Sequence, residues 1–270
     1  MAETIDTERT HDTESDVILE THGLTKKFGE VVANDDISIS VKDDELRSII
    51  GPNGAGKTTF FNQIAGVLPA TSGTVHFRGE DITELSIEER SQLGIGRSYQ
   101  SNEVFFDRTV FENVRVAAQT AEVGDFSFNV FSRARNYQQD RAEEILEQLR
   151  LWDKRDTTAE NLSHGDQRRL GIAIAIATDP DLLLLDEPTS GMGPEATEET
   201  AELIEDIRND LGIAIVLIEH DMSVVMGISD RITVLYNGDH IATGSPEEIR
   251  TDEAVQDAYL GGMKEEELEL

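Results

Sequence analysis

The stretch Gly51-Pro-Asn-Gly-Ala-Gly-Lys-Thr-Thr59 decides the fold of this 270-residue chain. It matches the full pattern of a phosphate-binding loop, in which two glycines enclose four residues and Lys-Ser/Thr follows. The apolar run Leu46–Ile50 before it predicts a buried strand, and a helix is expected to begin near Lys57. A loop between a strand and a helix points backbone amides at phosphate oxygens, so the sequence predicts a nucleotide site here.

Individual residues of this loop have expected roles. Lys57 is expected to bring a positive charge to the β and γ phosphates, and the Thr58 hydroxyl is expected to bind Mg²⁺. The strand before the loop and the helix after it argue against a chance glycine turn. The other predicted nucleotide-binding positions of the loop are Gly51, Asn53, Gly54, Ala55, Gly56 and Thr59.

A second motif, Leu182-Leu-Leu-Leu-Asp186-Glu187-Pro188, reads as a buried strand that ends in carboxylates. In α/β sheets, residues at the carboxyl ends of strands lie where ligands bind. Asp186 is therefore expected on the magnesium side of the site, and Glu187 is suited to polarise an attacking water. Together with the phosphate-binding loop, this motif predicts a P-loop NTPase.

The remaining pattern predicts an α/β fold. Alternating apolar residues in 17–50 predict short antiparallel strands, and Thr74–Phe77 predicts a further hairpin strand. After residue 162, continuous apolar runs alternate with helical segments, which indicates a parallel sheet covered on both faces. The elements expected there are the helices Gln167–Thr178 and Glu195–Asn209 and the strands Leu182–Leu185 and Ile213–Ile218.

The segment between about Gly94 and Leu162 has a different character. No strand is evident in it, and Asp140–Leu151 has the apolar spacing of an amphipathic helix. We therefore expect a RecA-like P-loop NTPase core with an antiparallel β subdomain and an inserted α-helical subdomain at about 94–162. The expected boundaries are a disordered acidic leader at 1–16, a single domain at 17–262 and an acidic tail at 263–270.

Composition excludes several classes of function. With 55 acidic against 23 basic residues, the net charge of −32 disfavours contact with nucleic acid or anionic lipid. Such a surface is expected of a protein adapted to a salt-rich cytoplasm, where the repulsion is screened. The absence of cysteine excludes disulfides and thiolate catalysis. The longest apolar runs have about eight residues, far below the roughly 20 of a membrane span.

The segment Leu162-Ser-His-Gly-Asp-Gln-Arg-Arg-Leu170 distinguishes among P-loop NTPases. It resembles the signature motif of the ATP-binding cassette (ABC) family, which has leucine, serine, two small residues and glutamine at this place. The resemblance implies that Ser163 and Gly165 face the γ-phosphate of a nucleotide on an opposing subunit. His164 and Asp166 depart from the commonest form. Because a carboxylate near phosphate is unfavourable, we expect Asp166 to cap Ser163 or its helix and to point away.

Further residues take positions that this resemblance marks. Gln100 is similar to the glutamine that joins the core to the helical insertion and reaches magnesium and water. His220 resembles the switch histidine, which senses the γ-phosphate. Phe28 matches the aromatic that stacks on adenine, although core packing is the simpler explanation without the family. Ser190–Pro194 occupies the loop that links the two sites of a dimer, with Gly193 where the family usually has an acid or an amide.

The resemblance covers about residues 17–262 and is strongest to the ATP-binding subunits of branched-chain amino acid importers. It is carried by Gly165–Leu170, Ile218–Met222, Gly227–Arg231 and Ala258–Gly261. Urea importers share Leu-Ser-His-Gly and Gly-Met, so urea or a short amide stays open as the cargo. The implied cofactors are ATP and Mg²⁺. The implied partners are a second ATPase subunit, permease subunits at the cytoplasmic face of the membrane and, indirectly, an external substrate-binding protein.

Two other classes fit the sequence less well. Soluble ABC proteins that act on ribosomes or DNA usually carry two cassettes or a long coiled coil together with basic surfaces. This chain has one cassette and a net charge of −32, so no nucleic-acid partner is expected. A P-loop kinase of small molecules would leave Leu162–Leu170 and His220 without a purpose.

Overall fold

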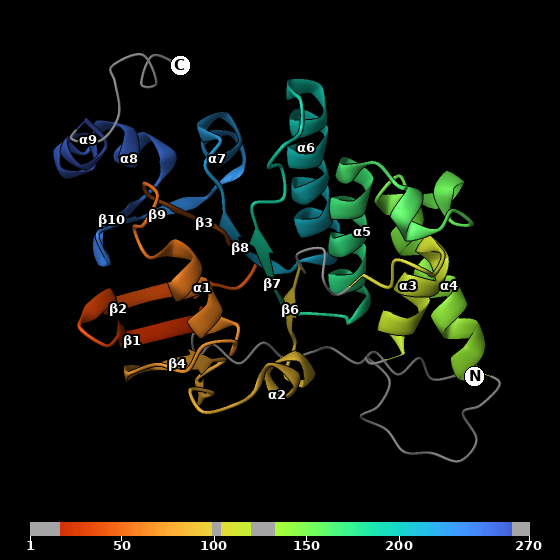
Figure 1. The fold of residues 1–270 in the computed structure, drawn as a ribbon, viewed down its shortest axis with the longest axis horizontal. Helices are drawn as coiled ribbons and strands as arrows, with labels where there is room; N and C mark the ends of the chain where they lie inside the picture. The colour runs from red at the N-terminus through yellow and green to blue at the C-terminus, as the bar shows by residue number, and fades with distance from the viewer. Residues whose placement is uncertain (1–16, 99–103, 120–132, 261–270) are drawn as a thin grey trace, which may run out of the picture.

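The computed structural model describes residues 17–98, 104–119 and 133–260 (Figure 1). The predicted leader at 1–16 and the predicted tail at 263–270 lie outside these residues, as does part of the predicted helical insertion. Among the described residues, no helix combines the length and the apolar character needed to cross a membrane.

A mixed sheet forms the centre of the fold, in the strand order β10-β9-β3-β8-β7-β6. All neighbouring strands pair in parallel except β10, which pairs antiparallel with β9. The predicted buried parallel sheet is thus confirmed. Its strands are β3 (Leu46–Ile50), β6 (Ile95–Arg97), β7 (Leu182–Asp186), β8 (Ala214–Ile218), β9 (Arg231–Tyr236) and β10 (Asp239–Gly244).

The second sheet is antiparallel, in the order β2-β1-β4-β5. Its strands are β1 (Val17–Phe28), β2 (Val31–Lys42), β4 (Ser72–Phe77) and β5 (Glu80–Asp81). The expectation of several short strands before residue 42 is wrong, because β1 and β2 each run for 12 residues. Register shifts along β1 interrupt the apolar alternation without ending the strand. Buried Thr21 also continues the pairing, since its Oγ1 donates to Ile37 O at 3.1 Å.

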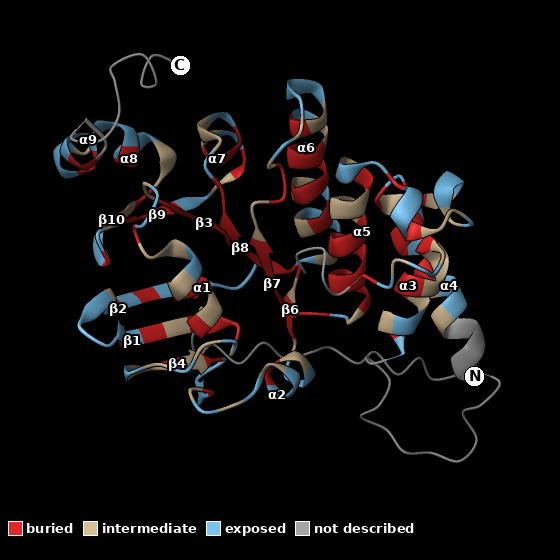
Figure 2. Cartoon of the chain, in the orientation of Figure 1, coloured by how far each residue is buried: buried red, intermediate tan, exposed pale blue. Residues whose placement is uncertain are grey.

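Helices cover both faces of the parallel sheet (Figures 1 and 2). On one face, the side chains of Leu183, Leu185, Ile215 and Leu217 share a core with the helices that lie between residues 110 and 228. On the other face, Leu182, Leu184, Val216 and Ile218 pack with α1 and the antiparallel sheet. The helices are α1 (Lys57–Ile64), α2 (Ile87–Gln92), α3 (Val110–Ala118), α4 (Arg133–Gln148), α5 (His164–Ala177), α6 (Pro194–Leu211), α7 (Met222–Ile228), α8 (Pro246–Thr251) and α9 (Glu253–Leu260).

The helical subdomain consists of α3 and α4 packed against α5, on the opposite side of the molecule from the antiparallel sheet (Figure 1). Its predicted amphipathic face is confirmed, since Ala142, Ile145, Leu146 and Leu149 are fully buried. The expectation that no strand occurs between about Gly94 and Leu162 is wrong, because β6 (Ile95–Arg97) forms one edge of the parallel sheet. α5 also begins three residues earlier than predicted, with Ser163 as its N-cap.

Candidate nucleotide site

The phosphate-binding loop joins the end of β3 to the start of α1, as predicted. Gly56 precedes α1 and adopts a φ of 97°, a left-handed conformation that favours glycine. A Cβ at this position would lie 2.4 Å from both Ala33 O and Asn34 Nδ2. Any larger residue would therefore displace the loop or the β2 strand beneath it.

Asn34 supports the loop from below, a role that sequence reasoning missed. Its side chain is fully buried, and its Nδ2 donates to Gly56 O at 3.2 Å. The turn at Gly238 completes this support, because Gly238 N donates to Ala55 O at 3.1 Å and Asp35 N donates to Gly238 O at 2.9 Å. The shape of the loop thus depends on segments from β2 and from the β9–β10 turn.

Lys57 is folded back onto its own loop. Its Nζ donates to Gly51 O at 2.6 Å and to Pro52 O at 3.1 Å. Burial lowers the pKa of the Lys57 ammonium, whereas the charges of Glu187 and Asp186 act in the opposite direction. The loop lysine and the two predicted carboxylates therefore share one site.

Asp186 ends β7 beside this lysine. Its Oδ2 is buried and has no hydrogen-bond partner among the described residues. Burial raises the pKa of Asp186, and the positive charge of Arg97 only partly opposes this. An orphaned, buried carboxylate oxygen is costly unless a cation or a donor completes it.

This geometry fits a magnesium site that is completed by substrate. The described residues include no group of three His, Cys, Asp or Glu side chains able to hold a metal alone. Mg²⁺ is commonly held by one or two carboxylates together with phosphate oxygens and waters. Asp186 and the Thr58 hydroxyl would supply the protein ligands of such a site, whereas Gln100 lies outside the described residues.

Glu187 and His220 meet at the same edge of the sheet. His220 Nδ1 lies 3.9 Å from Glu187 Oε1, and the His220 side chain is exposed whereas that of Glu187 is about half-buried. Glu187 has a φ of 47°, a left-handed conformation that is unfavourable for a residue with a side chain. Its amide donates to Ile218 O at 2.9 Å, and Arg168 of α5 donates to its carbonyl. Sequence reasoning missed this contact of Arg168.

Phe28 ends β1 and is 50% exposed, so the alternative of core packing is wrong. Lys26 Nζ lies 5.2 Å from the centre of its ring. An exposed aromatic ring flanked by a cation is free to stack on a planar, electron-rich group.

The signature segment begins α5, with Ser163 as the N-cap and Gly165 in the first turn. Ser163 Oγ donates to Asp166 Oδ2 at 2.6 Å, and Lys154 Nζ lies 2.5 Å from the same oxygen. The expectation that Asp166 interacts with Ser163 is confirmed. In the described chain no hydrogen bond or ion pair joins Ser163 or Gly165 to the phosphate-binding loop, although the intervening His164 lines a pocket with Asp186 and Glu187.

Known proteins are similar to this chain in both sequence and fold. The family described as "ABC transporter" matches residues 34–190, and that described as "Branched-chain amino acid ATP-binding cassette transporter" matches residues 240–265. Over 252 residues, the chain is 42% identical to the high-affinity branched-chain amino acid transport ATP-binding protein LivG of Escherichia coli (strain K12), covering 92% of this chain and 99% of LivG.

Two solved structures are also similar. The ADP conformation of MJ1267, an ATP-binding cassette of an ABC transporter, has a TM-score of 0.77 and 32% identity, covering 91% of this chain and 99% of MJ1267. A dimeric post-hydrolysis state of the ATP-binding cassette MJ0796, bound to ADP and Pi, has a TM-score of 0.73 and 26% identity, covering 85% of this chain and 99% of MJ0796.

Proposed function

The chain belongs to the ATP-binding cassette (ABC) transporter family, and from this premise we propose that it is the ATP-hydrolysing subunit of an importer for branched-chain amino acids. The observation that carries the proposal is the meeting of Lys57, Asp186, Glu187 and His220 at one edge of the parallel sheet, within a chain that resembles LivG along nearly its whole length.

The residues of the site divide the work of ATP hydrolysis. Lys57 and the amides of the phosphate-binding loop bind the phosphates, and Phe28 stacks on adenine. Bound Mg²⁺, with Thr58, Asp186 and Gln100 as its proposed ligands, would neutralise charge on the phosphates. Glu187 orients the attacking water and takes its proton, and His220 contacts the γ-phosphate.

Ser163 and Gly165 need a second subunit. Because they form no hydrogen bond or ion pair with their own phosphate-binding loop among the described residues, we propose that they face the γ-phosphate bound to an opposing cassette, with the start of α5 supplying amides and a positive dipole end. The dimeric state of MJ0796 supports this arrangement. The opposing cassette is a second copy of this chain or a sister subunit.

The other proposed partners follow from the same family. Permease subunits hold the ATPase at the cytoplasmic face of the membrane, and an external binding protein delivers the cargo. Urea is the competing cargo, because its importers share Leu-Ser-His-Gly at 162–165. The domain is proposed to span 17–262, and its helical subdomain, together with Gln100, transmits the closure of the dimer to the permease.

Transport by the reconstituted assembly tests the proposal. The chain would be combined with its permease and binding protein in vesicles, and ATP-dependent uptake of leucine and of urea would be compared. Uptake of leucine that requires Glu187 is the expected result. Uptake of urea without uptake of leucine would contradict the proposed cargo. Co-purification with ribosomes or nucleic acid in place of a membrane protein would contradict the proposal that the chain serves an importer.

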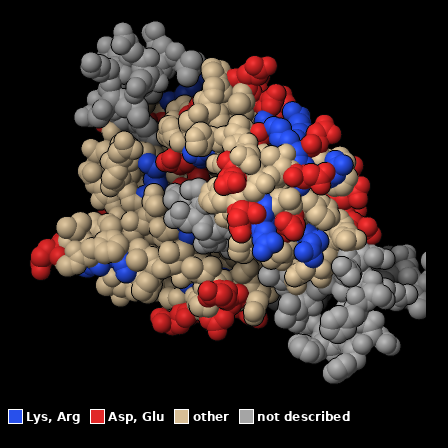
Figure 3. All heavy atoms as spheres, turned by 45° about the vertical axis from the view of Figure 1, so that its right-hand side comes forward, with Lys and Arg blue, Asp and Glu red and all other residues tan. Residues whose placement is uncertain are grey.

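We also propose that the acidic surface is an adaptation to a salt-rich cytoplasm. Acidic side chains are spread over the face in Figure 3, where they are interleaved with Lys and Arg. The chain has 55 acidic against 23 basic residues and therefore a net charge of −32. High salt would screen the repulsion that this charge causes. The proposal fails if the purified chain keeps its fold equally well in dilute buffer and in molar KCl.

A further inference from the structure

Glu219 is a buried carboxylate between two loops of the proposed active site. It follows β8 directly, and its side chain is 0% exposed. Its Oε1 accepts hydrogen bonds from Thr189 N at 2.9 Å and from Thr189 Oγ1 at 2.5 Å. Its Oε2 accepts one from His220 N at 3.0 Å and a longer one from Asp221 N at 3.5 Å. One side chain thus ties the loop after β7 to the loop after β8.

Because Glu219 is buried, loss of any of these hydrogen bonds to its carboxylate would be destabilising. In the part of the chain that the structure describes, no lysine or arginine forms an ion pair with Glu219, and His220 Nδ1 lies 3.8 Å from Glu219 Oε2. A carboxylate withdrawn from water without such a partner depends on its hydrogen bonds. The donors on both loops must therefore stay in place around it.

The two residues proposed to act on ATP are attached to these same loops. Glu187 lies two residues before Thr189, and His220 follows Glu219 directly. Register pairing of Asp186 with Ile218 brings the two strand ends together. Glu187, the first residue after β7, adopts a left-handed conformation with a φ of 47°. Because this conformation is unfavourable for a residue with a side chain, it depends on the surrounding contacts.

We propose that Glu219 and Thr189 are positioning residues for ATP hydrolysis, which hold Glu187 and His220 at their separation of 3.9 Å. Neither residue touches the nucleotide. Glu219 holds the loop that carries His220 through hydrogen bonds from the backbone of that loop. Its hydrogen bonds with Thr189 hold the loop that carries Glu187 against the first one. The inference rests on the proposed role of Glu187 in activating water.

Substitutions that keep size but remove acceptors or donors test this arrangement in the full-length chain. Glu219→Gln places an amide NH₂ group among N–H and O–H donors, and Thr189→Val removes the hydroxyl at nearly constant volume. Both are expected to lower kcat for ATP about ten- to a hundredfold, because small errors in the placement of reacting groups are costly. The affinity for ATP, measured with a fluorescent ATP analogue, is expected to change less than twofold.

Matched variants separate positioning from simple destabilisation. Thr189→Ser keeps the hydroxyl and is expected to recover most of the rate lost in Thr189→Val. Thr21→Val removes an equally buried hydroxyl, 1% exposed and bonded across β1 and β2, and is expected to lower the melting temperature without lowering kcat. If Glu219→Gln does not fold, the comparison of kcat between Thr189→Ser and Thr189→Val still tests the proposal.

Three results would overturn the inference. One is turnover within twofold of wild type in Thr189→Val, another is equal loss of rate in Thr189→Ser and Thr189→Val, and the third is loss of rate in Thr21→Val to the same degree. Failure of the proposed function would look different, since the wild type and Glu187→Gln would then hydrolyse ATP at the same rate.

Discussion

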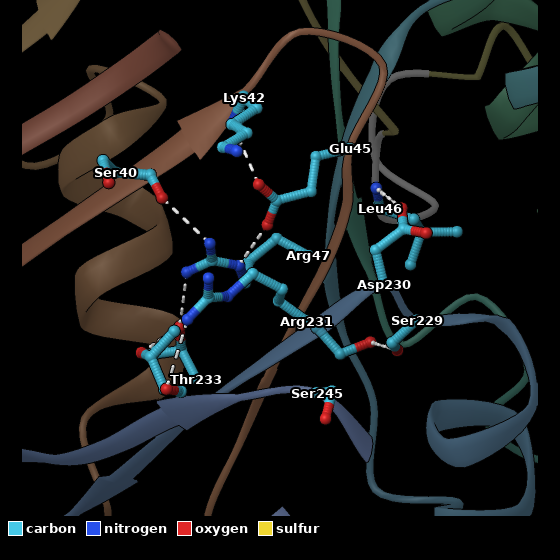
Figure 4. Close-up of polar contacts among 12 residues, drawn as sticks. Ser40, Lys42, Glu45, Leu46, Arg47, Ser229, Asp230, Arg231, Thr233 and Ser245 are labelled. Carbon is cyan, nitrogen blue, oxygen red and sulfur yellow. Dashed lines mark hydrogen bonds and ion pairs between the residues drawn. The ribbon is translucent and has the colours of Figure 1, made fainter. Parts of the chain in front are cut away.

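Arg47 Nε lies 2.6 Å from Glu45 Oε1, and both side chains are almost completely buried beside the start of β3 (Figure 4). The remaining guanidinium nitrogens of Arg47 donate to Thr233 Oγ1 at 3.0 Å and to Ser40 O at 2.9 Å. The second oxygen of Glu45 accepts from Lys42 N at 3.0 Å. This network joins the antiparallel sheet to the parallel sheet through charged groups that have left water.

Removing one partner of this pair is predicted to be strongly destabilising. Glu45→Ala leaves Arg47 buried without its carboxylate, and we expect a loss of about 3–5 kcal/mol in the free energy of unfolding. The double variant Glu45→Gln, Arg47→Met is expected to lose much less, because neither charge is then buried alone. Denaturant unfolding in high KCl measures both, and equal losses in the two proteins would contradict the prediction.

Glu187→Gln is predicted to separate binding from turnover. The amide cannot accept a proton from water, so kcat is expected to fall at least about a hundredfold. ATP binding is expected to stay intact and to trap a nucleotide-bound dimer, visible by gel filtration with ATP and Mg²⁺. Glu143→Gln, on the exposed face of α4, is the matched control and should turn over normally. Rapid hydrolysis by Glu187→Gln would remove Glu187 from its role.

Lys57→Ala is predicted to weaken the binding of nucleotide itself. The ammonium lies within the phosphate-binding loop, bonded to Gly51 O and Pro52 O, and is free to exchange these carbonyls for phosphate oxygens. We expect the Kd for ATP to rise at least about tenfold, which corresponds to about 1.4 kcal/mol. Lys42→Ala, at an exposed position, should leave the Kd unchanged. An unchanged Kd in Lys57→Ala would refute the assignment.

Asp166 is predicted to make stability depend on pH in the acid range. Burial acts to raise the pKa of Asp166, but the hydrogen bonds from Lys154 and Ser163 outweigh it and hold the pKa below its usual value. The carboxylate therefore stabilises the folded chain above its ordinary pKa of about 4, and this contribution is lost as the pH falls through the lower, folded-state pKa.

Asp166→Asn tests this dependence. At neutral pH the variant is expected to lose about 1.5–3 kcal/mol of unfolding free energy, as is typical for hydrogen bonds to a charged group. The difference from wild type should shrink as the pH falls below about 4. Unfolding free energies measured from pH 7 downward check this, and a difference that is independent of pH would exclude the charge as its cause.

The sequence predicts those parts of the fold that are specified by a pattern within a short stretch of consecutive residues. Leu182–Leu185 and the run ending at Ile218 are apolar throughout, and glycines with Lys57 specify the phosphate-binding loop. β6 escaped prediction because Ile95-Gly96-Arg97 is too short to show a period. β1 seemed to break at polar residues, but Thr21 and Thr25 are buried there with their hydroxyls hydrogen-bonded.

The supporting residues of the site depend on contacts between distant segments. Asn34 and Arg168 reach the phosphate-binding loop and Glu187 only after the chain has folded. Nothing in the neighbouring sequence marks them, since a polar residue in a strand or an arginine on a helix is ordinarily at the surface. For Glu219, its place next to His220 at a strand end was the one available sign, and its partner Thr189 lies on another strand's loop.

A single backbone atom, the carbonyl oxygen of Ala33, restricts two distant positions of the chain. A Cβ at Gly56 would lie 2.4 Å from it, and a Cβ at Gly238 would lie 3.0 Å from it. Every amino acid carries this oxygen, so no replacement of Ala33 can make room. In a saturation mutagenesis library, position 56 should therefore tolerate only glycine, position 238 should strongly favour it, and no second-site suppressor should arise at position 33.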